Sequence, residues 1–413
     1  MTYTPHILAF ISITSLIGCV EGLELDGTPC PCTEGWTCCP VTNVCARESS
    51  QCPGWCGNGI VDENEVCDSG DDNRNEYSLN KTCSTTCDGF APHCGDGEIQ
   101  QNMPLDASYE GCDPGSEDHP ITETLCSELH PMLGDGTTKC MSNCIGYDTS
   151  TCSNQDVTFV PAGPFMMGCD PENDLDCNPK DTVDYVRESP MHKVILSAYI
   201  IDKNEVTVAA YLECVEAGIC EYTGPITDDD PNFLDPDTRY FQTGYDDYPV
   251  NFTLWAESQA YCEYRGMRLP TEAQWEKAAR GPDSRIFPWG SSLPNCDLAI
   301  IRNSTGPGCG ENRAWPVGSR TAGAGPYGNL DMAGNLWEWV HDWGGPDYYQ
   351  ESPLHDPQGP DSSEFGMRIV RGGSWGTQIL STVRAALRFG NFPDFHNGYL
   401  GFRCASSVQE SSK

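Results

Sequence analysis

Apolar and polar positions follow two different patterns along this sequence, and the change falls near residue 153. Between Cys30 and Cys152, Gly, Asp, Asn, Ser and Thr are frequent and apolar periodicity is nearly absent. From residue 157 onward, aromatic residues increase and apolar positions recur with the periods of strands and helices. The pattern predicts a loop-dominated first region with little core, followed by an α+β domain.

Strands and helices can be predicted in the second region. Residues 157–168 have the pattern of two strands around a Pro-Gly turn, and residues 192–207 are rich in β-forming residues. A helix is expected to begin near Val206 and to stop at Gly218.

The clearest helix is predicted over residues 269–281. Thr271 and Gln274 form a capping box, and a Gly-Pro pair ends the helix. We expect one face of this helix to be buried. The residues on that face are Trp275, Ala278 and Ala279.

An apolar run near the N-terminus, residues 7–18, is too short to span a bilayer as a helix. It predicts the core of a signal peptide over residues 1–18. The run ends in Leu-Ile-Gly followed by Cys19, which resembles the lipobox of bacterial lipoproteins and implies a lipid on Cys19. The alternative is an ordinary signal peptide cleaved nearby, because residues 1–6 contain no Lys or Arg. Since the residue directly after Cys19 is not Asp, the resemblance favours the outer membrane.

Cysteine usage indicates an oxidising compartment. The sequence has 25 cysteines, and setting Cys19 aside leaves an even number that can all pair. After a linker at 19–29, the region 30–152 holds 16 of them and needs cross-links in place of a core. Zinc binding is the alternative, but the paired C-x2-C spacing of zinc sites is missing.

The cysteine-rich region contains an internal repeat. The first copy runs from Cys56 to Cys87 and the second, longer copy from Cys94 to Cys144. Both copies resemble the cysteine-rich repeats of bacterial surface proteins, and residues 30–52 form a separate six-cysteine group. We interpret this region as a spacer or an interaction stalk.

The net charge of −38 argues against nucleic acid as a partner, because the phosphate backbone would be repelled. Simple solvation of an acidic surface is the alternative explanation for this charge. Any membrane attachment is therefore expected to come from the lipid on Cys19 and not from attraction to anionic headgroups.

The segment RGGSWG, residues 371–376, contains the G-x-S-x-G pattern of hydrolase nucleophile elbows, with Ser374 in the nucleophile position. That architecture requires an alternating α/β chain with triad partners well downstream. No alternating pattern precedes the motif, and only 37 residues follow Gly376, so that Asp394 and His396 lie too close to serve as triad partners. We therefore do not interpret Ser374 as a hydrolase nucleophile.

Eight segments in order resemble the formylglycine-generating enzyme, or sulfatase-modifying factor, family. They are FVPAGPFMMG, DKNEVTVAAYLE, YPVNFTLWAESQAYCEYRGMRLPTEAQWEKAARG, FPWG, PVGS, GNLDMAGNLWEWVHDW, RIVRGGSWG and GYLGFRCA. They cover residues 157–406 and leave a tail at 407–413. The resemblance implies an irregular, C-type-lectin-like α+β fold.

The resemblance also implies a catalytic site that this sequence does not complete. Active members bind copper(I) through two cysteine thiolates shortly after GGSW and oxidise a substrate cysteine to formylglycine. Here the nearest positions are Thr377 and Thr382, and no cysteine lies between Cys309 and Cys404. A hydroxyl is too hard a ligand for copper(I), so we expect copper-dependent oxidation to be lost.

Other positions of the family cleft are retained. By resemblance, Ser374, Trp337 and Arg388 line the substrate groove. The alternative is a structural role for each: Trp337 in a core, Arg388 paired with a carboxylate, and Ser374 capping a turn.

A calcium site is also implied by resemblance, in the loop DMAGNLWEW. Asp331 and Glu338 would supply side-chain oxygens, and Gly334 and Leu336 backbone carbonyls, which suit calcium. The alternative is a loop held by its tryptophans alone.

Four disulfides are expected in the second region. Cys262 and Cys404 match a family disulfide that joins distant parts of the domain. The remaining pairs are suggested by proximity in sequence, which does not establish connectivity. They are Cys214 with Cys220, Cys169 with Cys177, and Cys296 with Cys309.

These observations lead to a hypothesis of a cell-envelope lipoprotein whose cysteine-rich repeats carry a formylglycine-generating-enzyme-like domain. That domain is expected to bind a peptide, protein or glycan ligand in the retained cleft. Two alternatives remain: an oxidoreductase that uses a different metal or cofactor, and a structural envelope scaffold.

Overall fold

The computed structural model describes residues 37–38, 45–46, 124–141, 147–172, 174, 177, 187–224, 244–378 and 380–407. The chain forms two compact units, residues 1–96 and 97–413. In the first unit, β1 (Thr37–Cys38) pairs antiparallel with β2 (Cys45–Ala46). The expected signal peptide, Cys19, the linker and most of the expected repeats lie outside the described residues.

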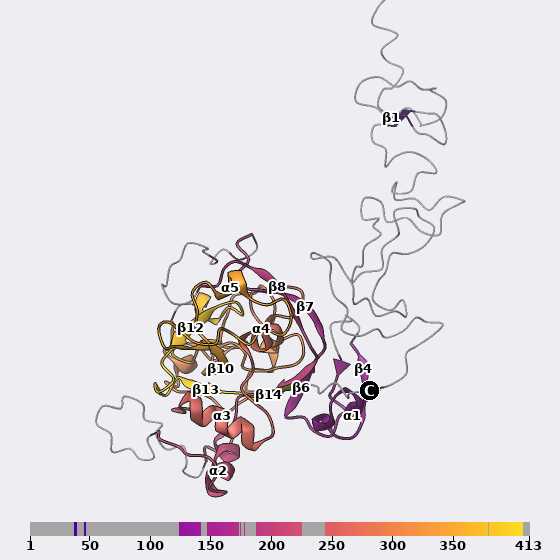
Figure 1. The fold of residues 1–413 in the computed structure, drawn as a ribbon. Helices are drawn as coiled ribbons and strands as arrows, with labels where there is room; N and C mark the ends of the chain where they lie inside the picture. Colours follow the sequence, from indigo (N-terminus) through magenta and orange to yellow (C-terminus); the bar gives the residue numbers. More distant parts are fainter. Residues whose placement is uncertain are drawn as a thin grey trace, which may run out of the picture. The chain divides into compact units, whose positions relative to one another are not determined.

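The second unit is an α+β fold made of short elements, which confirms the expected fold class (Figure 1). Its strands are β3 (Thr124–Leu125), β4 (Thr137–Cys140), β5 (Tyr147–Asp148), β6 (Val157–Val160), β7 (Gly163–Met167), β8 (His192–Leu196), β9 (Tyr199–Asp202), β10 (Trp337–Trp343), β11 (Arg368–Arg371), β12 (Arg388–Asn391), β13 (Leu400–Phe402) and β14 (Ala405–Ser407). Its α-helices are α1 (Cys126–Leu129), α2 (Val208–Glu216), α3 (Trp255–Tyr264), α4 (Glu272–Arg280) and α5 (Tyr348–Glu351). Short 3-10 helices are η3 (Pro131–Leu133), η4 (Gly308–Gly310), η5 (Thr321–Gly323) and η6 (Leu380–Val383). Within the described ranges, no helix combines the length and apolar character that a bilayer span requires.

Two sheets organise the domain. The larger has the strand order β12-β11-β10-β13, in which β10 and β13 are parallel and the other neighbours antiparallel. The second has the order β14-β9-β6, so β14, the last described strand, pairs with β9, which precedes helix α2. Strands β7 and β8 form a separate antiparallel pair.

The predicted elements are present with shifted boundaries. The stretch 157–168 forms β6 and β7, and the stretch 192–207 forms β8 and β9, which belong to different sheets. Helix α2 begins after Thr207, whose hydroxyl accepts a hydrogen bond from the backbone N–H of Ala210.

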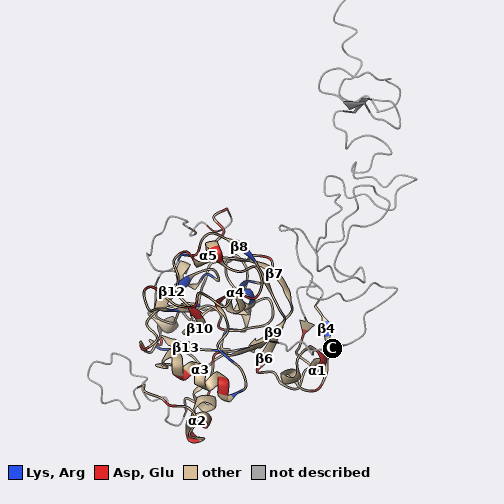
Figure 2. Ribbon diagram, viewed as in Figure 1, with Lys and Arg blue, Asp and Glu red and all other residues tan. Residues whose placement is uncertain are grey.

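Figure 2 marks acidic positions on both α2 and α3, neither of which contains Lys or Arg.

Helix α4 is buried on all sides, which exceeds the expectation of one buried face. Its capping box is present: the Thr271 hydroxyl accepts from the Gln274 N–H, and Gln274 Oε1 accepts from the Thr271 N–H. All nine residues of the helix are buried. Glu272, Glu276 and Arg280 take part in ion pairs, and Lys277 Nζ donates to the carbonyls of Pro161 and Gly163.

One face of the larger sheet packs against helix α4. On this face, Arg371, Arg388 and Glu338 form hydrogen bonds with polar groups of α4. The opposite face carries Val370 and Phe389, which are register partners in β11 and β12. This second face forms the floor of the cavity described below.

The second unit begins before the expected domain boundary at 157. Cys126, Leu133 and Cys152 are buried in the same apolar cluster as Val157 and Phe159. The described residues of this segment, 124–141 and 147–152, which the cysteine pattern groups with the repeats, therefore contribute to the core of the domain.

Five disulfides join pairs of described cysteines in this unit. The four expected pairs, Cys169–Cys177, Cys214–Cys220, Cys262–Cys404 and Cys296–Cys309, are all present. A further one joins Cys126 to Cys152.

Candidate functional site

A cavity of about 750 Å³ opens on the larger sheet. All five cleft positions named from the sequence line it: Trp337, Ser374, Thr377, Thr382 and Arg388. Trp337 belongs to β10, Ser374 and Thr377 to the segment after β11, Thr382 to η6 and Arg388 to β12, so the fold brings together residues up to 51 positions apart.

Glycines of RGGSWG allow the loop to pass close to its neighbours. A Cβ on Gly373, whose φ is +74°, would lie 2.6 Å from a Val383 methyl group. A Cβ on Gly376 would lie 2.5 Å from the Tyr399 ring. A side chain at either position would have to displace Val383 or Tyr399. These glycines therefore serve packing of the cavity wall, which agrees with rejecting a nucleophile elbow.

Ser374 lies in a tight turn at the cavity wall. Its N–H donates to Thr377 Oγ1 at 2.9 Å, and its carbonyl accepts from the Thr377 N–H at 2.9 Å. Ser374 as a residue is only 3% exposed, and its described hydrogen bonds are made by its backbone. Because Ser374 lines the cavity, its hydroxyl is available to a ligand or to water there.

Arg388 is committed to a buried ion pair, as the structural interpretation expected. Its Nε and one terminal nitrogen bind the two carboxylate oxygens of Glu272 at 2.7 and 2.5 Å. The guanidinium also lies over the ring of Tyr349, 4.3 Å from its centroid. Burial alone would lower the pKa of Arg388, but Glu272 raises it above the ordinary value, so the arginine stays charged and paired.

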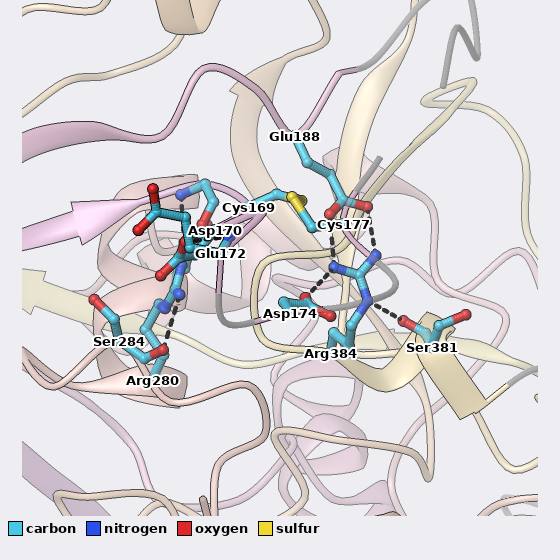
Figure 3. Close-up of a disulfide and its surroundings, with 12 residues drawn as sticks. Cys169, Asp170, Glu172, Asp174, Cys177, Glu188, Arg280, Ser284, Ser381 and Arg384 are labelled. Carbon is cyan, nitrogen blue, oxygen red and sulfur yellow. Dashed lines mark hydrogen bonds and ion pairs between the residues drawn. A yellow bond between two sulfur atoms is a disulfide. The ribbon is translucent and has the colours of Figure 1, made fainter. Parts of the chain in front are cut away.

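A second arginine of the cavity wall, Arg384, is neutralised in the same way (Figure 3). It binds Asp174 at 2.7 Å and Glu188 at 2.9 and 3.0 Å. Asp174 lies in the loop closed by the Cys169–Cys177 disulfide. The disulfide packs on Ala386, so this loop braces the segment that forms the wall.

No thiol of the described domain faces the cavity. Every cysteine at described positions from 124 onward is disulfide-bonded, and none of them lines the cavity. Thr377 and Thr382 both approach Gly373, where a Cβ would be 3.2 Å from Thr377 Oγ1 and 3.0 Å from the Thr382 carbonyl. These hydroxyl side chains do not fit copper(I), which prefers soft sulfur ligands.

The expected calcium residues lie on one loop that enters β10. Both oxygens of Glu338 accept from Arg403 at 2.7 Å, and Oε2 also accepts from Trp275 Nε1. Asp331 accepts from the N–H of Gly318 at 2.6 Å. The carbonyls of Gly334 and Leu336 accept no hydrogen bond from the described residues.

Buried negative charge accumulates at this loop. Burial raises the pKa of Glu205 well above its ordinary value, and the carboxylates of Asp331 and Glu338 raise it further. Burial likewise raises the pKa of Asp331 to about 6. Excess negative charge and two free carbonyls fit a hard cation. Against this, no three His, Cys, Asp or Glu side chains of the described residues converge as metal ligands.

Sequence reasoning missed the aromatic and amide residues of the cavity. These are Phe389, Asn391, Phe395, Asn397 and Tyr399. A signal was available: residues 389–399 place three Phe and one Tyr among Gly, Pro, Asp and Asn, a composition typical of exposed loops. Aromatic residues in such a loop indicate a binding surface.

Comparison with known proteins gives the same family as the sequence motifs. Residues 145–408 match the family model for the sulfatase-modifying factor enzyme 1-like domain. Formylglycine-generating enzyme of Streptomyces coelicolor is 32% identical over 270 residues, which cover 54% of this chain and 83% of that protein.

Relatives with other names share the same region. Serine/threonine-protein kinase pkn1 of Chlamydia caviae is 30% identical over 262 residues, or 62% of this chain, but the match spans only 38% of the kinase. Hercynine oxygenase of Mycolicibacterium smegmatis is 31% identical over 279 residues, covering 60% of this chain and 61% of that enzyme. Among solved structures, PvdO from Pseudomonas aeruginosa is 24% identical, with a TM-score of 0.47, over 62% of this chain and 96% of PvdO.

Proposed function

The chain belongs to the sulfatase-modifying factor enzyme 1-like family, and from this premise we propose that its domain is a ligand-binding module that has lost copper-dependent formylglycine formation. The observation that carries the proposal is the composition of the cavity. It retains the cleft residues Trp337, Ser374 and Arg388 but has hydroxyls at Thr377 and Thr382, where the resemblance requires thiolates. A cleft without its metal ligands can still bind, because binding depends on shape and on the lining groups.

The experiment is a direct activity assay. Oxidised full-length protein receives copper(I), oxygen, a reductant and a Cys-x-Pro-x-Arg peptide, and mass spectrometry follows the peptide. We expect the substrate thiol to remain, while an active relative converts it to the aldehyde in the same buffer. Conversion by this protein would overturn the proposal and favour an oxidoreductase, the activity suggested by the relatives named as enzymes.

A matched gain-of-function variant sharpens the assay. In Thr377→Cys/Thr382→Cys, two thiols would stand at the positions nearest to those of the family's copper ligands. If the double variant binds one equivalent of copper(I) and wild type binds none, the missing thiols explain the loss. If wild type itself binds copper(I) tightly, the ligand argument fails.

The proposed module would act at the bacterial cell envelope, attached to the outer membrane by a lipid on Cys19. Support comes from the lipobox-like segment and the oxidised cysteines. Mass spectrometry of the N-terminal peptide from a bacterial membrane fraction tests this, since a diacylglyceryl group adds a defined mass to Cys19. An unmodified N-terminus after cleavage elsewhere would contradict it.

Calcium is proposed as a structural ion of the domain. Asp331 and Glu338 would hold it together with the carbonyls of Gly334 and Leu336. Its charge would offset the buried carboxylates, and it would rigidify the loop before β10. Elemental analysis of protein dialysed without chelator is expected to give one calcium per chain, falling in Asp331→Ala. Absence of calcium from wild type would leave the loop held by its tryptophans and by Arg403.

A further inference from the structure

The cavity also indicates the chemical class of its ligand, an inference that rests on the proposed binding function. We propose that it takes an uncharged carbohydrate. Three features of the cavity wall carry the proposal: its charges are already paired, its aromatic side chains are exposed, and its remaining polar groups are hydroxyls and carboxamides.

The charged residues of the cavity wall are already paired with one another or with buried carboxylates. Glu188, Arg384 and Arg388 are the charged side chains among the described residues that line the cavity. Arg384 pairs with Glu188 and Asp174, and Arg388 pairs with Glu272. A charged ligand group would lose its water here without gaining a free counter-ion, which is unfavourable.

Aromatic side chains form the apolar part of the wall. Trp337 and Phe389 lie with ring centroids 6.1 Å apart on the floor, and Phe395 and Tyr399 come from the adjoining loop. Phe389 and Phe395 are each 42% exposed and Tyr399 38%, and since all three line one cavity they form an exposed apolar patch of the kind that marks a binding site. Flat apolar faces of this kind match the C–H faces of sugar rings.

Neutral polar groups complete the lining. Ser374 lines the cavity, and its described hydrogen bonds are made by its backbone, so its hydroxyl can serve a ligand. Asn391 and Asn397 each use the side-chain oxygen to accept a backbone N–H, which leaves the carboxamide nitrogen as a donor. Hydroxyl and amide groups can both donate to and accept from the hydroxyls at the rim of a sugar, and they specify its orientation.

A neutral peptide is the main competing occupant. The edge strand β12 contributes Phe389 and Asn391, and a peptide strand could pair with such an edge. The observations favour the sugar because the aromatic faces and neutral polar groups lie together inside the cavity.

The test uses the full oxidised chain and an array of neutral hexose and N-acetylhexosamine oligosaccharides. Each sugar is matched by a deacetylated cationic form and by an anionic uronate of the same length. Saturation-transfer NMR identifies binders, and calorimetry measures affinity. We expect binding of at least one neutral sugar, with about tenfold weaker affinity for its charged counterparts.

Variants locate the binding. Phe389→Ala and Ser374→Ala are each expected to weaken affinity about tenfold, through loss of a stacking face and of a hydrogen bond. Phe392→Ala is the matched control, because Phe392 is 50% exposed on the same segment but does not line the cavity. Circular dichroism of each variant confirms folding.

Every outcome of this test either supports or overturns the carbohydrate proposal. Neutral-sugar binding that depends on Phe389 and Ser374 but not on Phe392 supports the proposal. Binding that is unaffected by Phe389→Ala, or that is tighter for charged sugars, overturns it. If a neutral peptide library binds in a Phe389-dependent manner and no sugar does, the carbohydrate proposal fails and the binding function stands. If neither class binds, both proposals fail and the scaffold alternative is favoured.

Discussion

Buried charged side chains distinguish this domain at the scale of single residues. Arg371, Arg388 and Arg403 are all buried, and each binds a buried carboxylate. A buried ion pair contributes little net stability, but removing one partner leaves an unpaired buried charge. These pairs therefore constrain which substitutions the core can tolerate, and Arg388 extends this constraint to the cavity wall.

The first prediction concerns Arg388. Arg388→Met should lower the free energy of unfolding by about 3 kcal/mol, because Glu272 loses its bidentate partner in the core. Urea denaturation followed by circular dichroism measures this. Glu272→Met/Arg388→Met should recover most of the loss, since both charges are then absent. A single variant as stable as wild type would mean that the pair is not formed in solution.

A second residue-scale prediction concerns Lys277. Burial lowers the pKa of its ammonium group from 10.5 to about 7 in the folded protein. Between these values the unfolded state binds more protons, so wild-type stability should rise as the pH increases from 7 to 9. Lys277→Met removes this proton linkage, and the slope of unfolding free energy against pH should be lower by about 1 kcal/mol per pH unit. Equal slopes for both proteins, from urea titrations at each pH, would contradict it.

Single-residue roles were only partly predictable from the sequence. The gathering of Trp337, Ser374 and Arg388 followed from resemblance, and a carboxylate partner for Arg388 was weighed as a structural alternative. The sequence could not identify Glu272 as this partner, because the two residues are 116 positions apart. The ion pair between Arg384 and Asp174 joins residues 210 positions apart, and no pattern of neighbouring residues predicts it either.

At the scale of elements, helix α4 shows how local and tertiary signals combine. Its capping box and its glycine stop are readable from sequence, because they depend on neighbouring residues. Its complete burial is not, since Glu272, Glu276 and Arg280 look like solvent-facing residues until their partners are known. Helix α3 has no amphipathic pattern and was not predicted, although Glu257 accepts from the Leu254 N–H at its start.

The helix cap gives a matched pair of variants. Thr271→Ala should cost about 1 kcal/mol of stability, because the Gln274 N–H loses its acceptor at a buried helix start. Thr271→Ser keeps the hydroxyl and should cost less than half as much. Chemical denaturation of both variants tests the cap, and equal losses would assign the effect to the methyl group instead.

At the scale of the whole molecule, disulfides connect distant parts of the second unit. Cys262 and Cys404 are 142 residues apart, whereas Cys214 and Cys220 are 6 apart. The family resemblance anticipated the first, and short spacing suggested the second. Packing of segment 124–152 onto the core was not anticipated, because its cysteine content groups it with the repeats.

Comparing these two disulfides gives the last prediction. Removing Cys262–Cys404 as a double alanine variant should cost about 5 kcal/mol, and removing Cys214–Cys220 about 2 kcal/mol, since the longer cross-link restricts the unfolded chain more. Denaturant midpoints under oxidising conditions measure both losses. Similar losses would indicate that local packing, and not chain entropy, governs their contribution.

The pairing of β14 with β9 has a consequence for synthesis. Arg403 binds Glu338, Cys404 is bonded to Cys262, and β14 completes the sheet that β6 and β9 begin. A nascent chain that ends before residue 403 lacks all three connections and leaves β9 with an open edge. The domain therefore cannot mature segment by segment as it leaves the ribosome, and a product truncated there should be recognised by proteases as unfolded.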